Sequence, residues 1–339
     1  MCKVSVIIPV YNIEEYIEDC IHSLIHQTLE DCEFIFVNDG STDRSRTILS
    51  KYQKLDERIK VVDKPNEGIA TVRPLGVKHA NGKYIFFLDG DDYLHNNALL
   101  NLYQCAVSSN VDIVAGSHSR IRNGTVEGYF DWGEEGIVST SAFIKRSIEL
   151  NNFYIWGKLF KSKLLVHDYY YGRSSYGEDG VLLMQIALLS NNCFIFNKNI
   201  YYYRLRPLSL TNLDTEKSYI DRYESSVFIR SFIKSQVTDK EILKCADLYY
   251  LFQVFKTIYD CPKAFLNRED SHEVLKDIEH LDIYKSQLVD KDFYAYYVLK
   301  QYSIGDPNLK YKLFVIRLFR RAKRGLKKIN RVMKHATKK

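Results

Sequence analysis

Three carboxylates follow directly on an apolar run in the stretch YIFFLDGDDYLHNN, residues 84–97. Residues i and i+2 of an extended chain point the same way, so Asp89 and Asp91 are expected to converge on one small volume. Gly90 between them allows close approach of the backbone. Two converging carboxylates repel each other unless a cation lies between them, and such hard oxygen ligands suit Mg²⁺ or Mn²⁺. The alternative is a turn or a helix cap, the commoner meaning of a short acidic motif taken alone.

Polar residues also end two earlier apolar runs. Asn12 follows VSVIIPV, and the sequence NDGSTD, residues 38–43, follows EFIFV. One interpretation of NDGSTD is a turn with a helix cap, in which Asp39 or Ser41 accepts hydrogen bonds from free N–H groups of the next helix. The other is a nucleotide site, in which a carboxylate accepts the N3–H of a uracil and the end of the first run packs on the base. Polar clusters at the ends of the first, second and fourth apolar runs favour a shared ligand site.

The apolar runs themselves predict the fold. VSVIIPV, EFIFVND, IKVVD and KYIFFLD are rich in β-branched or aromatic residues, and they alternate with segments of helical spacing. This order predicts an α/β fold with a mostly parallel sheet and helices on both faces, in which ligands collect at the carboxyl ends of the strands. Further along we expect a strand in VDIVAG, a polar loop with Gly124, Gly128 and Gly133, a helix near residues 139–150, and strands in CFIFN and IYYYRLR.

Helical periodicity alone remains from about residue 215, so we place a domain boundary near residue 212. The prediction is a sheet-containing domain over residues 1–212, a helical domain over 213–305 and a basic amphipathic helix over 306–339. Two other nucleotide-binding motifs are excluded by inspection. GVKHANGKY lacks the Ser or Thr and the following helix of a phosphate loop, and no GxGxxG follows the first strand.

The composition fits a soluble globular protein. The 339 residues are 46% hydrophobic and 27% charged, which is enough to bury the cores of two domains. No apolar run reaches the roughly 18 residues that span a bilayer, and VSVIIPVYN is too short for a signal peptide and is interrupted by proline. We therefore expect a cytoplasmic protein. The seven cysteines are scattered without a CxxC pair, which predicts reduced core residues rather than a disulfide framework or a zinc site.

Six separated motifs follow one another along the chain: VSVIIPVYN, FVNDGSTD, NEGIATVRPLGVKHANGKYIFFLDGDD, WGKLFKSKLL, YGEDGVLLMQIAL and YYYRLRPLSLT. In order and spacing they resemble the nucleotide-sugar-binding half of glycosyltransferase family 2 enzymes with the GT-A fold, over roughly residues 3–212. The resemblance implies an inverting, metal-dependent transfer of a sugar from a UDP-sugar to a hydroxyl of a glycan, a lipid-linked saccharide or a glycoprotein, in the synthesis of a cell-surface polysaccharide or glycoconjugate. The alternative is a non-catalytic sugar-nucleotide or glycan-binding subunit of a partner transferase.

The resemblance assigns a donor site and a metal site. Asp89 and Asp91 form the DxD pair that would hold the donor and a Mn²⁺ or Mg²⁺ ion, and Arg206 would contact the diphosphate. A divalent cation and an arginine would neutralise the charge that develops on the departing diphosphate. The donor nucleotide site would take Pro9, Val10, Tyr11, Asn12, Asp39, Asn66, Gly68, Arg73, Asp89 and Gly90.

The resemblance also assigns the catalytic base to Asp179 of the ED motif. Such a base needs no permanent pairing partner, and Glu178 beside it could raise its pKa by like-charge repulsion. Acidic residues are also favoured at a helix N-terminus by the macrodipole, and the two interpretations coexist. One departure from the family is that Pro74 follows Arg73, where the family usually has Asn. Proline suits the first turn of a helix but removes a side-chain donor near the donor site.

Acceptor recognition has the weakest signal in the sequence. Trp156 and Lys158, together with Tyr154 and His118, are candidates for a carbohydrate subsite, because aromatic faces stack on sugars and polar tips bind hydroxyls. Glu178 is counted with them because it neighbours the proposed base. The alternative is that Trp156 packs in the core. A homo-oligomer is compatible with the sequence.

The C-terminal segment differs in charge from the rest of the chain. Residues 310–339 carry thirteen Lys or Arg and no Asp or Glu, which leaves 6 − 13 = −7 for residues 1–309. Apolar residues recur there at helical spacing opposite a basic face, so we expect an amphipathic helix at the anionic inner face of the plasma membrane. The alternatives are a packed helix or a solvated tail, and the acidic body argues against nucleic acid. The apolar stripe consists of Tyr311, Val315, Leu318, Phe319, Ala322, Leu326, Ile329 and Met333.

Overall fold

The structure is a computed structural model that describes residues 1–170, 177–206, 215–261, 265 and 268–270. It divides into two compact units, residues 1–249 and 250–339, and each is described by itself. The predicted boundary near residue 212 and the predicted basic helix over 306–339 lie outside the described residues, so both stay predictions. No helix in the described part of the chain is both long and apolar enough to cross a membrane.

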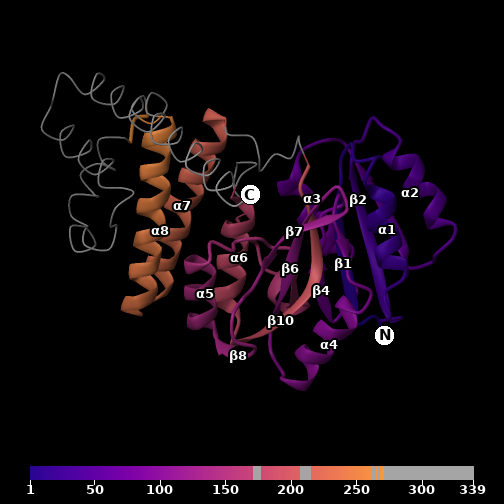
Figure 1. The fold of residues 1–339 in the computed structure, drawn as a ribbon, viewed down its shortest axis with the longest axis horizontal. Helices are drawn as coiled ribbons and strands as arrows, with labels where there is room; N and C mark the ends of the chain where they lie inside the picture. The colour runs from indigo at the N-terminus through magenta and orange to yellow at the C-terminus, as the bar shows by residue number, and fades with distance from the viewer. Residues whose placement is uncertain (171–176, 207–214, 262–264, 266–267, 271–339) are drawn as a thin grey trace, which may run out of the picture. The chain divides into compact units, whose positions relative to one another are not determined.

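One ten-stranded sheet organises the first unit (Figure 1). Its strands are β1 (Val4–Val10), β2 (Cys32–Asp39), β3 (Ile59–Lys64), β4 (Tyr84–Phe87), β5 (Tyr93–Leu94), β6 (Ile113–Arg122), β7 (Thr125–Phe130), β8 (Gly136–Ser139), β9 (Lys158–Lys161) and β10 (Asn192–Arg204). The helices are α1 (Ile17–Ile25), α2 (Ser45–Gln53), α3 (Ile69–His79), α4 (Ala98–Ser108), α5 (Thr140–Glu149), the 3₁₀ helix η1 (Ser162–Leu165), α6 (Glu178–Leu189), α7 (Glu216–Gln236) and α8 (Lys240–Asp260).

The strands follow the order β3-β2-β1-β4-β9-β6-β10-β5, with β7 beside β6 and β8 beside β10. β1 pairs in parallel with β2 and β4, β2 pairs in parallel with β3, and β6 pairs in parallel with β10. β9 runs antiparallel to both of its neighbours, and β5 runs antiparallel to β10. The predicted α/β fold with a mostly parallel sheet is confirmed. The carboxyl ends of β1, β2 and β4 therefore meet at one edge of the sheet.

Helices cover both faces of the sheet, because successive strand residues point to opposite sides. Val6 and Ile8 of β1 belong to a core cluster that includes buried residues of α1, α2 and α4. Ile7 belongs to a second cluster that includes buried residues of α5 and α6. In Figure 1, α1 and α2 accordingly lie on one side of the strands and α5 and α6 on the other. The predicted helix near residues 139–150 is confirmed as α5, and Ser139 caps it by accepting the N–H of Ala142.

The region between residues 117 and 138 differs from the prediction. The expected polar loop contains two strands, β7 and β8, which pair with β6 and β10. The two strands expected in CFIFN and IYYYRLR are one strand, β10, whose register shifts between Phe196 and Tyr201. The short strand β9 was not predicted from the sequence. Its place between β4 and β6 brings Lys158 into the middle of the sheet.

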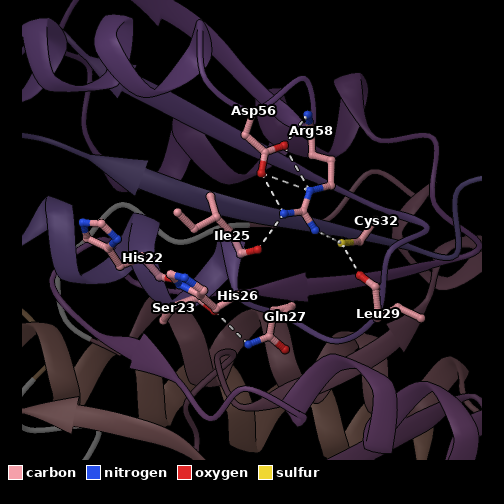
Figure 2. A network of polar contacts seen from close by, with 9 residues as sticks. All are labelled: His22, Ser23, Ile25, His26, Gln27, Leu29, Cys32, Asp56 and Arg58. Atoms are coloured by element: carbon pink, nitrogen blue, oxygen red, sulfur yellow. Dashed lines mark hydrogen bonds and ion pairs between the residues drawn. The ribbon is translucent and has the colours of Figure 1, made fainter.

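A polar network fixes the chain between α1 and β2 (Figure 2). Arg58 Nη2 donates to the carbonyl oxygen of Ile25 at 2.8 Å and pairs with Asp56 at 2.7 Å. The Cys32 thiol donates to the carbonyl oxygen of Leu29 at 2.9 Å. The Arg58 contact satisfies the carbonyl oxygen of Ile25, the last residue of α1, which has no hydrogen-bond partner within the helix. Arg58, directly before β3, thus ties the end of α1 to the sheet.

We expect Gly82→Ala to destabilise the fold. A Cβ at this position would lie 2.4 Å from the backbone nitrogen of Ser5, and a backbone atom cannot move aside as a flexible side chain can. Such overpacking costs about 1 to 3 kcal/mol in the free energy of unfolding. Denaturant unfolding of the wild type and the variant measures this difference. An unchanged midpoint would mean that the β1–β4 junction relaxes more easily than its packing indicates.

Candidate active site

Four of the predicted nucleotide residues lie at the carboxyl end of β1. Pro9 and Val10 are its last residues, Val10 is buried, and Tyr11 just beyond the strand is 49% exposed. Asn12 has a φ angle of 50°, and its Oδ1 accepts the N–H of Thr42 at 2.8 Å. Asn12 therefore ties the loop after β1 to the loop after β2. Tyr11 presents an exposed aromatic ring at this edge of the sheet.

Asp39 ends β2 and is only 4% exposed. Its Oδ1 accepts hydrogen bonds from Lys64 Nζ at 2.6 Å and from the N–H of Glu67 at 3.0 Å, and its Oδ2 accepts the N–H of Gly68 at 2.9 Å. Asp39 therefore holds the loop that leads into α3, a role that neither interpretation of NDGSTD anticipated. Asn66 is exposed in the same loop. Each carboxylate oxygen has two lone pairs, so a uracil N3–H remains compatible with these contacts.

The acidic cluster lies in a turn directly after β4. The N–H of Asp92 donates to the carbonyl oxygen of Asp89 at 3.0 Å, so the carboxylates are brought together by a turn and not by an extended chain. A Cβ at Gly90 would lie 2.6 Å from the carbonyl oxygen of Pro9. Glycine at this position therefore allows the turn to pack against the end of β1, which joins the acidic cluster to the other strand-end residues.

Two side chains of the turn have fixed partners. Asp92 is buried and accepts a hydrogen bond of 2.7 Å from the hydroxyl of Tyr201, so it anchors the turn to β10. Asp91 Oδ2 lies 2.5 Å from Arg206 Nη2. The guanidinium of Arg206 also lies over the ring of Tyr16, 5.1 Å from its centroid. The predicted diphosphate ligand and the predicted metal ligand are thus in direct contact.

Arg73 joins α3 to the ED motif at the start of α6. The side chain is buried, and it lies 3.3 Å from Glu178 Oε1 and 2.6 Å from Asp179 Oδ1. Asp179 therefore has an ionic partner in this structure, although a general base needs none. Pro74 lies inside α3 and not in its first turn, the part of a helix that proline suits best. There it removes one backbone donor from the helix.

Two of the carboxylates near Arg73, those of Asp89 and Glu178, hold their protons more tightly than usual. Burial raises the pKa of the Asp89 carboxyl to about 8; the Arg73 charge opposes this rise, and the Asp179 carboxylate adds to it. Burial and the Asp179 carboxylate also raise the pKa of Glu178 to about 7. Burial disfavours the Arg73 charge, but the carboxylates of Asp179 and Glu178 outweigh it and raise the pKa of Arg73. Three carboxylates surround one guanidinium, so an additional cation would be favoured here.

Asp179 is oriented by two contacts of different kinds. Its Oδ2 accepts the backbone N–H of Ile155 at 3.3 Å. Its Oδ1 forms the ion pair with Arg73 but accepts no aligned hydrogen bond from the part of the chain that the structure describes. Gly177, with a φ angle of 83°, turns the chain into α6 just before the motif. Each oxygen thus has one contact, and Oδ1, which is held by charge alone, is the better placed of the two to accept a hydroxyl proton.

The predicted acceptor residues are mostly buried. Trp156 is 3% exposed, Lys158 2% and His118 5%, and Trp156 stacks on Tyr154 at 4.4 Å between ring centroids. The core position of Trp156 agrees with the alternative that the sequence left open. Burial lowers the pKa of His118 to about 3, and the Lys158 charge contributes to this shift. Glu178 faces Arg73. Sugar contacts by this aromatic cluster are therefore not supported by its exposure.

The residues present fit a divalent cation that is shared with a ligand. In the described residues, no group of three or more His, Cys, Asp or Glu side chains could hold a metal ion alone. Asp89 and Asp91 offer two hard oxygen ligands in one turn, and Mg²⁺ or Mn²⁺ commonly completes such a set with water and substrate phosphates. A metal bound here would compete with Arg206 for Asp91. The donor set thus fits a cation that binds together with a diphosphate.

Two features of the site were missed by reasoning from the sequence. The first is the contact between Arg73 and Glu178, which joins residues 105 positions apart. The second is Lys158, whose ammonium group is enclosed near Asp179 although lysine is among the side chains that are most rarely buried. No local pattern marks either one, because both depend on where α6 and β9 meet the sheet.

The family comparison agrees with the strand-end geometry. Residues 5–167 match the model described as "Glycosyl transferase family 2". The chain is 33% identical over 225 residues to glycosyltransferase GlyA of Streptococcus pneumoniae serotype 4, a match that covers 63% of this chain and 32% of GlyA. The chain therefore spans about one third of the length of that relative.

Solved structures share the fold. The S. aureus TarS fragment 1–349 has a TM-score of 0.64 at 22% identity, covering 90% of this chain and 92% of that chain. The same fragment has also been solved in complex with UDP-GlcNAc. The mannosyltransferase PcManGT from Pyrobaculum calidifontis, in complex with GDP-Man and Mn²⁺, has a TM-score of 0.55 at 15% identity, covering 93% of this chain and 87% of that chain. At these identities the likeness establishes the fold alone.

Proposed function

The chain belongs to glycosyl transferase family 2, and from this premise we propose that it is an inverting, metal-dependent glycosyltransferase. It would move a hexosyl or N-acetylhexosaminyl group from a UDP-sugar to a hydroxyl of a glycan, a lipid-linked saccharide or a glycoprotein. The product would be a cell-surface polysaccharide or glycoconjugate. The UDP-GlcNAc complex of TarS and the GDP-Man and Mn²⁺ complex of PcManGT support a nucleotide-sugar donor with a divalent cation.

The observation that carries this proposal is the meeting of two acidic motifs at one edge of the sheet. Asp89 at the end of β4 and Asp179 at the start of α6 lie close enough that the Asp179 carboxylate raises the pKa of Asp89. A transferase needs a cationic site for the leaving diphosphate and a base for the acceptor hydroxyl within one small volume. The two motifs supply candidates for both.

Each residue has a definite part in the proposed reaction. The end of β1 and Asp39 would bind the uridine, and Arg206 would pair with the diphosphate. A divalent cation bound by Asp89 and Asp91 would neutralise charge on the leaving group. Asp179 would accept the proton of the acceptor hydroxyl from the face opposite the diphosphate. A single displacement of this kind inverts the anomeric centre, so an α-linked donor would give a β-glycoside.

Release of UDP from a panel of UDP-sugars tests the proposal. The full chain is incubated with Mn²⁺, each donor, and either water alone or simple saccharide acceptors. We expect one donor to be consumed faster than the rest, and faster still with a suitable acceptor. Binding of a UDP-sugar without turnover in any mixture would contradict the proposed enzyme and would instead favour a non-catalytic sugar-nucleotide-binding subunit.

We propose in addition that the basic segment, residues 306–339, brings the protein to the inner face of the plasma membrane. The support comes from the sequence alone. Thirteen cationic side chains could contribute up to roughly 1 kcal/mol each near an anionic surface, although salt screens them. The apolar stripe adds burial in the headgroup region, which salt does not weaken.

The apolar stripe can be tested without removing any charge that attracts lipid. We expect the double variant Leu318→Glu and Ile329→Glu to release the protein from anionic vesicles at moderate salt, because it removes apolar burial and keeps every Lys and Arg. Deletion of residues 308–339 should do the same and leave donor hydrolysis nearly unchanged. Vesicle sedimentation measures the bound fraction. A double variant that binds as tightly as the wild type would show that the stripe contacts protein and not lipid.

A further inference from the structure

One peptide group lies between the buried side chain of Lys158 and the half-buried side chain of Asp179. Lys158 Nζ donates to the carbonyl oxygen of Tyr154 at 2.6 Å. The N–H of Ile155, on the other side of the same peptide bond, donates to Asp179 Oδ2 at 3.3 Å. The carbonyl and the N–H of a peptide are coupled by resonance. A cationic donor on the carbonyl oxygen therefore makes the N–H of the same peptide a stronger donor to the Asp179 carboxylate, as in other chains of hydrogen bonds.

Lys158 is held in one place by its surroundings. It lies in β9 in the middle of the sheet, is 2% exposed, and also donates to Asn152 Oδ1 at 2.9 Å. Its ammonium group lies 5.1 Å from the ring centroid of Trp132, which is itself fixed by a hydrogen bond to the carbonyl oxygen of Gly116 at 2.9 Å. The side chain has no freedom to swing toward a ligand, so its effect must pass through the groups that it touches.

A packing role alone does not account for an ammonium group at this position. Burial lowers the pKa of Lys158 to about 7, and the charge of Asp179 opposes this shift. None of the ion pairs found among the described residues includes Lys158, so oxygen atoms without formal charge must satisfy its buried donors. Burying such a group costs free energy that an apolar side chain of similar length would not cost.

We propose that Lys158 is a positioning residue for the catalytic base. It fixes the peptide between Tyr154 and Ile155, and this peptide holds Asp179 in the orientation that accepts the hydroxyl proton. The inference rests on the proposed function, which assigns the base to Asp179. Because Lys158 is only 2% exposed, this positioning role replaces the role in sugar binding that the sequence suggested.

Two substitutions at Lys158 separate positioning from packing. Lys158→Met keeps the length and the apolar stem but has no donor, whereas Lys158→Gln keeps an N–H donor in a shorter side chain. Loss of one hydrogen bond corresponds to about tenfold in rate, so we expect kcat to fall about tenfold in Lys158→Met and less in Lys158→Gln. The Kd for the UDP-sugar should stay within about twofold in both. If packing alone matters, Lys158→Met will be the more active variant, and that order would overturn the inference.

A matched control lies on the same strand. Lys161 is also in β9 and pairs with Asp112 at 3.2 Å, away from Asp179. Lys161→Met makes the same chemical change as Lys158→Met, so we expect it to lower the thermal midpoint and leave kcat within about twofold of the wild type. A tenfold loss of kcat in Lys161→Met would show that any damage to β9 slows the enzyme, which would contradict a specific role for Lys158.

A double-mutant cycle tests whether Lys158 acts through Asp179. In an Asp179→Asn background, Lys158→Met should reduce kcat by less than about twofold, because the base that it positions is already lost. A further tenfold loss would overturn the inference. If Lys158→Met does not fold, Lys158→Gln in both backgrounds decides the same question. If Asp179→Asn alone leaves kcat unchanged, the proposed function fails; if it lowers kcat and the Lys158 variants do not, only this inference fails.

Discussion

Asp179→Asn is expected to lower kcat by about 10² or more while the Kd for the UDP-sugar changes by no more than a fewfold. Asparagine preserves the shape of the side chain and can still accept the N–H of Ile155, but it cannot take a proton from a hydroxyl. Steady-state kinetics for kcat and calorimetry for donor binding measure the two quantities separately. Loss of an interaction made only in the transition state lowers kcat without weakening donor binding.

Because Asp179 pairs with Arg73, the Kd for the UDP-sugar must be measured to separate loss of the base from disturbance of the donor site. Arg73 lies 2.6 Å from Asp179 Oδ1, so Asp179→Asn also removes a partner of a buried guanidinium. Asp168→Asn, at an exposed position, provides the control for the substitution itself. If Asp179→Asn instead weakens UDP-sugar binding strongly and leaves kcat nearly intact, Asp179 is a donor ligand and not the base.

Asp91→Asn is expected to abolish most transfer activity and the Mn²⁺-dependent part of UDP-sugar binding. The substitution removes one of the two hard oxygen ligands that the turn offers. The fold should be retained, because the ion pair with Arg206 is partly exposed and such a pair contributes little to the free energy of unfolding. Thermal unfolding in the absence of donor should therefore show little change in midpoint.

The same metal site can be tested without mutation. EDTA should reduce donor turnover by the wild type to the level of Asp91→Asn, and excess Mn²⁺ should restore it in the wild type only. Circular dichroism before and after chelation verifies that the protein stays folded. Full activity in EDTA would exclude the proposed metal dependence, and the Asp91 contact with Arg206 would then be the only role left to that carboxylate.

The N-terminal half of the fold was predictable because its signals are local. Each of the strands β1 to β4 is an apolar run, and the polar residues that follow these runs mark the carboxyl ends that meet at one edge. The alternation of these runs with segments of helical spacing also predicted helices on both faces. The short strand β9 has only four residues and is inserted antiparallel between β4 and β6, so its place depends on partners distant in sequence.

The candidate site was predictable in its members but not in its contacts. The resemblance selected Asp39, Asp91 and Asp179, which lie at the end of β2, in the turn after β4 and at the start of α6, and their roles stay predictions. The resemblance did not indicate that Asp39 accepts hydrogen bonds from the loop before α3, or that Arg73 pairs with the ED motif. Both contacts depend on how α3 and α6 pack in the fold. The burial of Lys158 was equally hidden, since hydropathy assigns a lysine to the surface.

The anomeric configuration of the first-formed product tests the central claim most directly. The wild-type chain is incubated with an α-linked UDP-sugar and Mn²⁺ at an enzyme concentration that consumes the donor within minutes. The signal of the product's anomeric proton is followed by NMR before the α- and β-anomers of the free sugar interconvert. A base at Asp179 that activates water or an acceptor opposite the diphosphate predicts that the β-anomer appears first, and that Asp179→Asn forms it at least about 10² times more slowly. A product that appears first as the α-anomer would contradict a single displacement and the role of Asp179 with it.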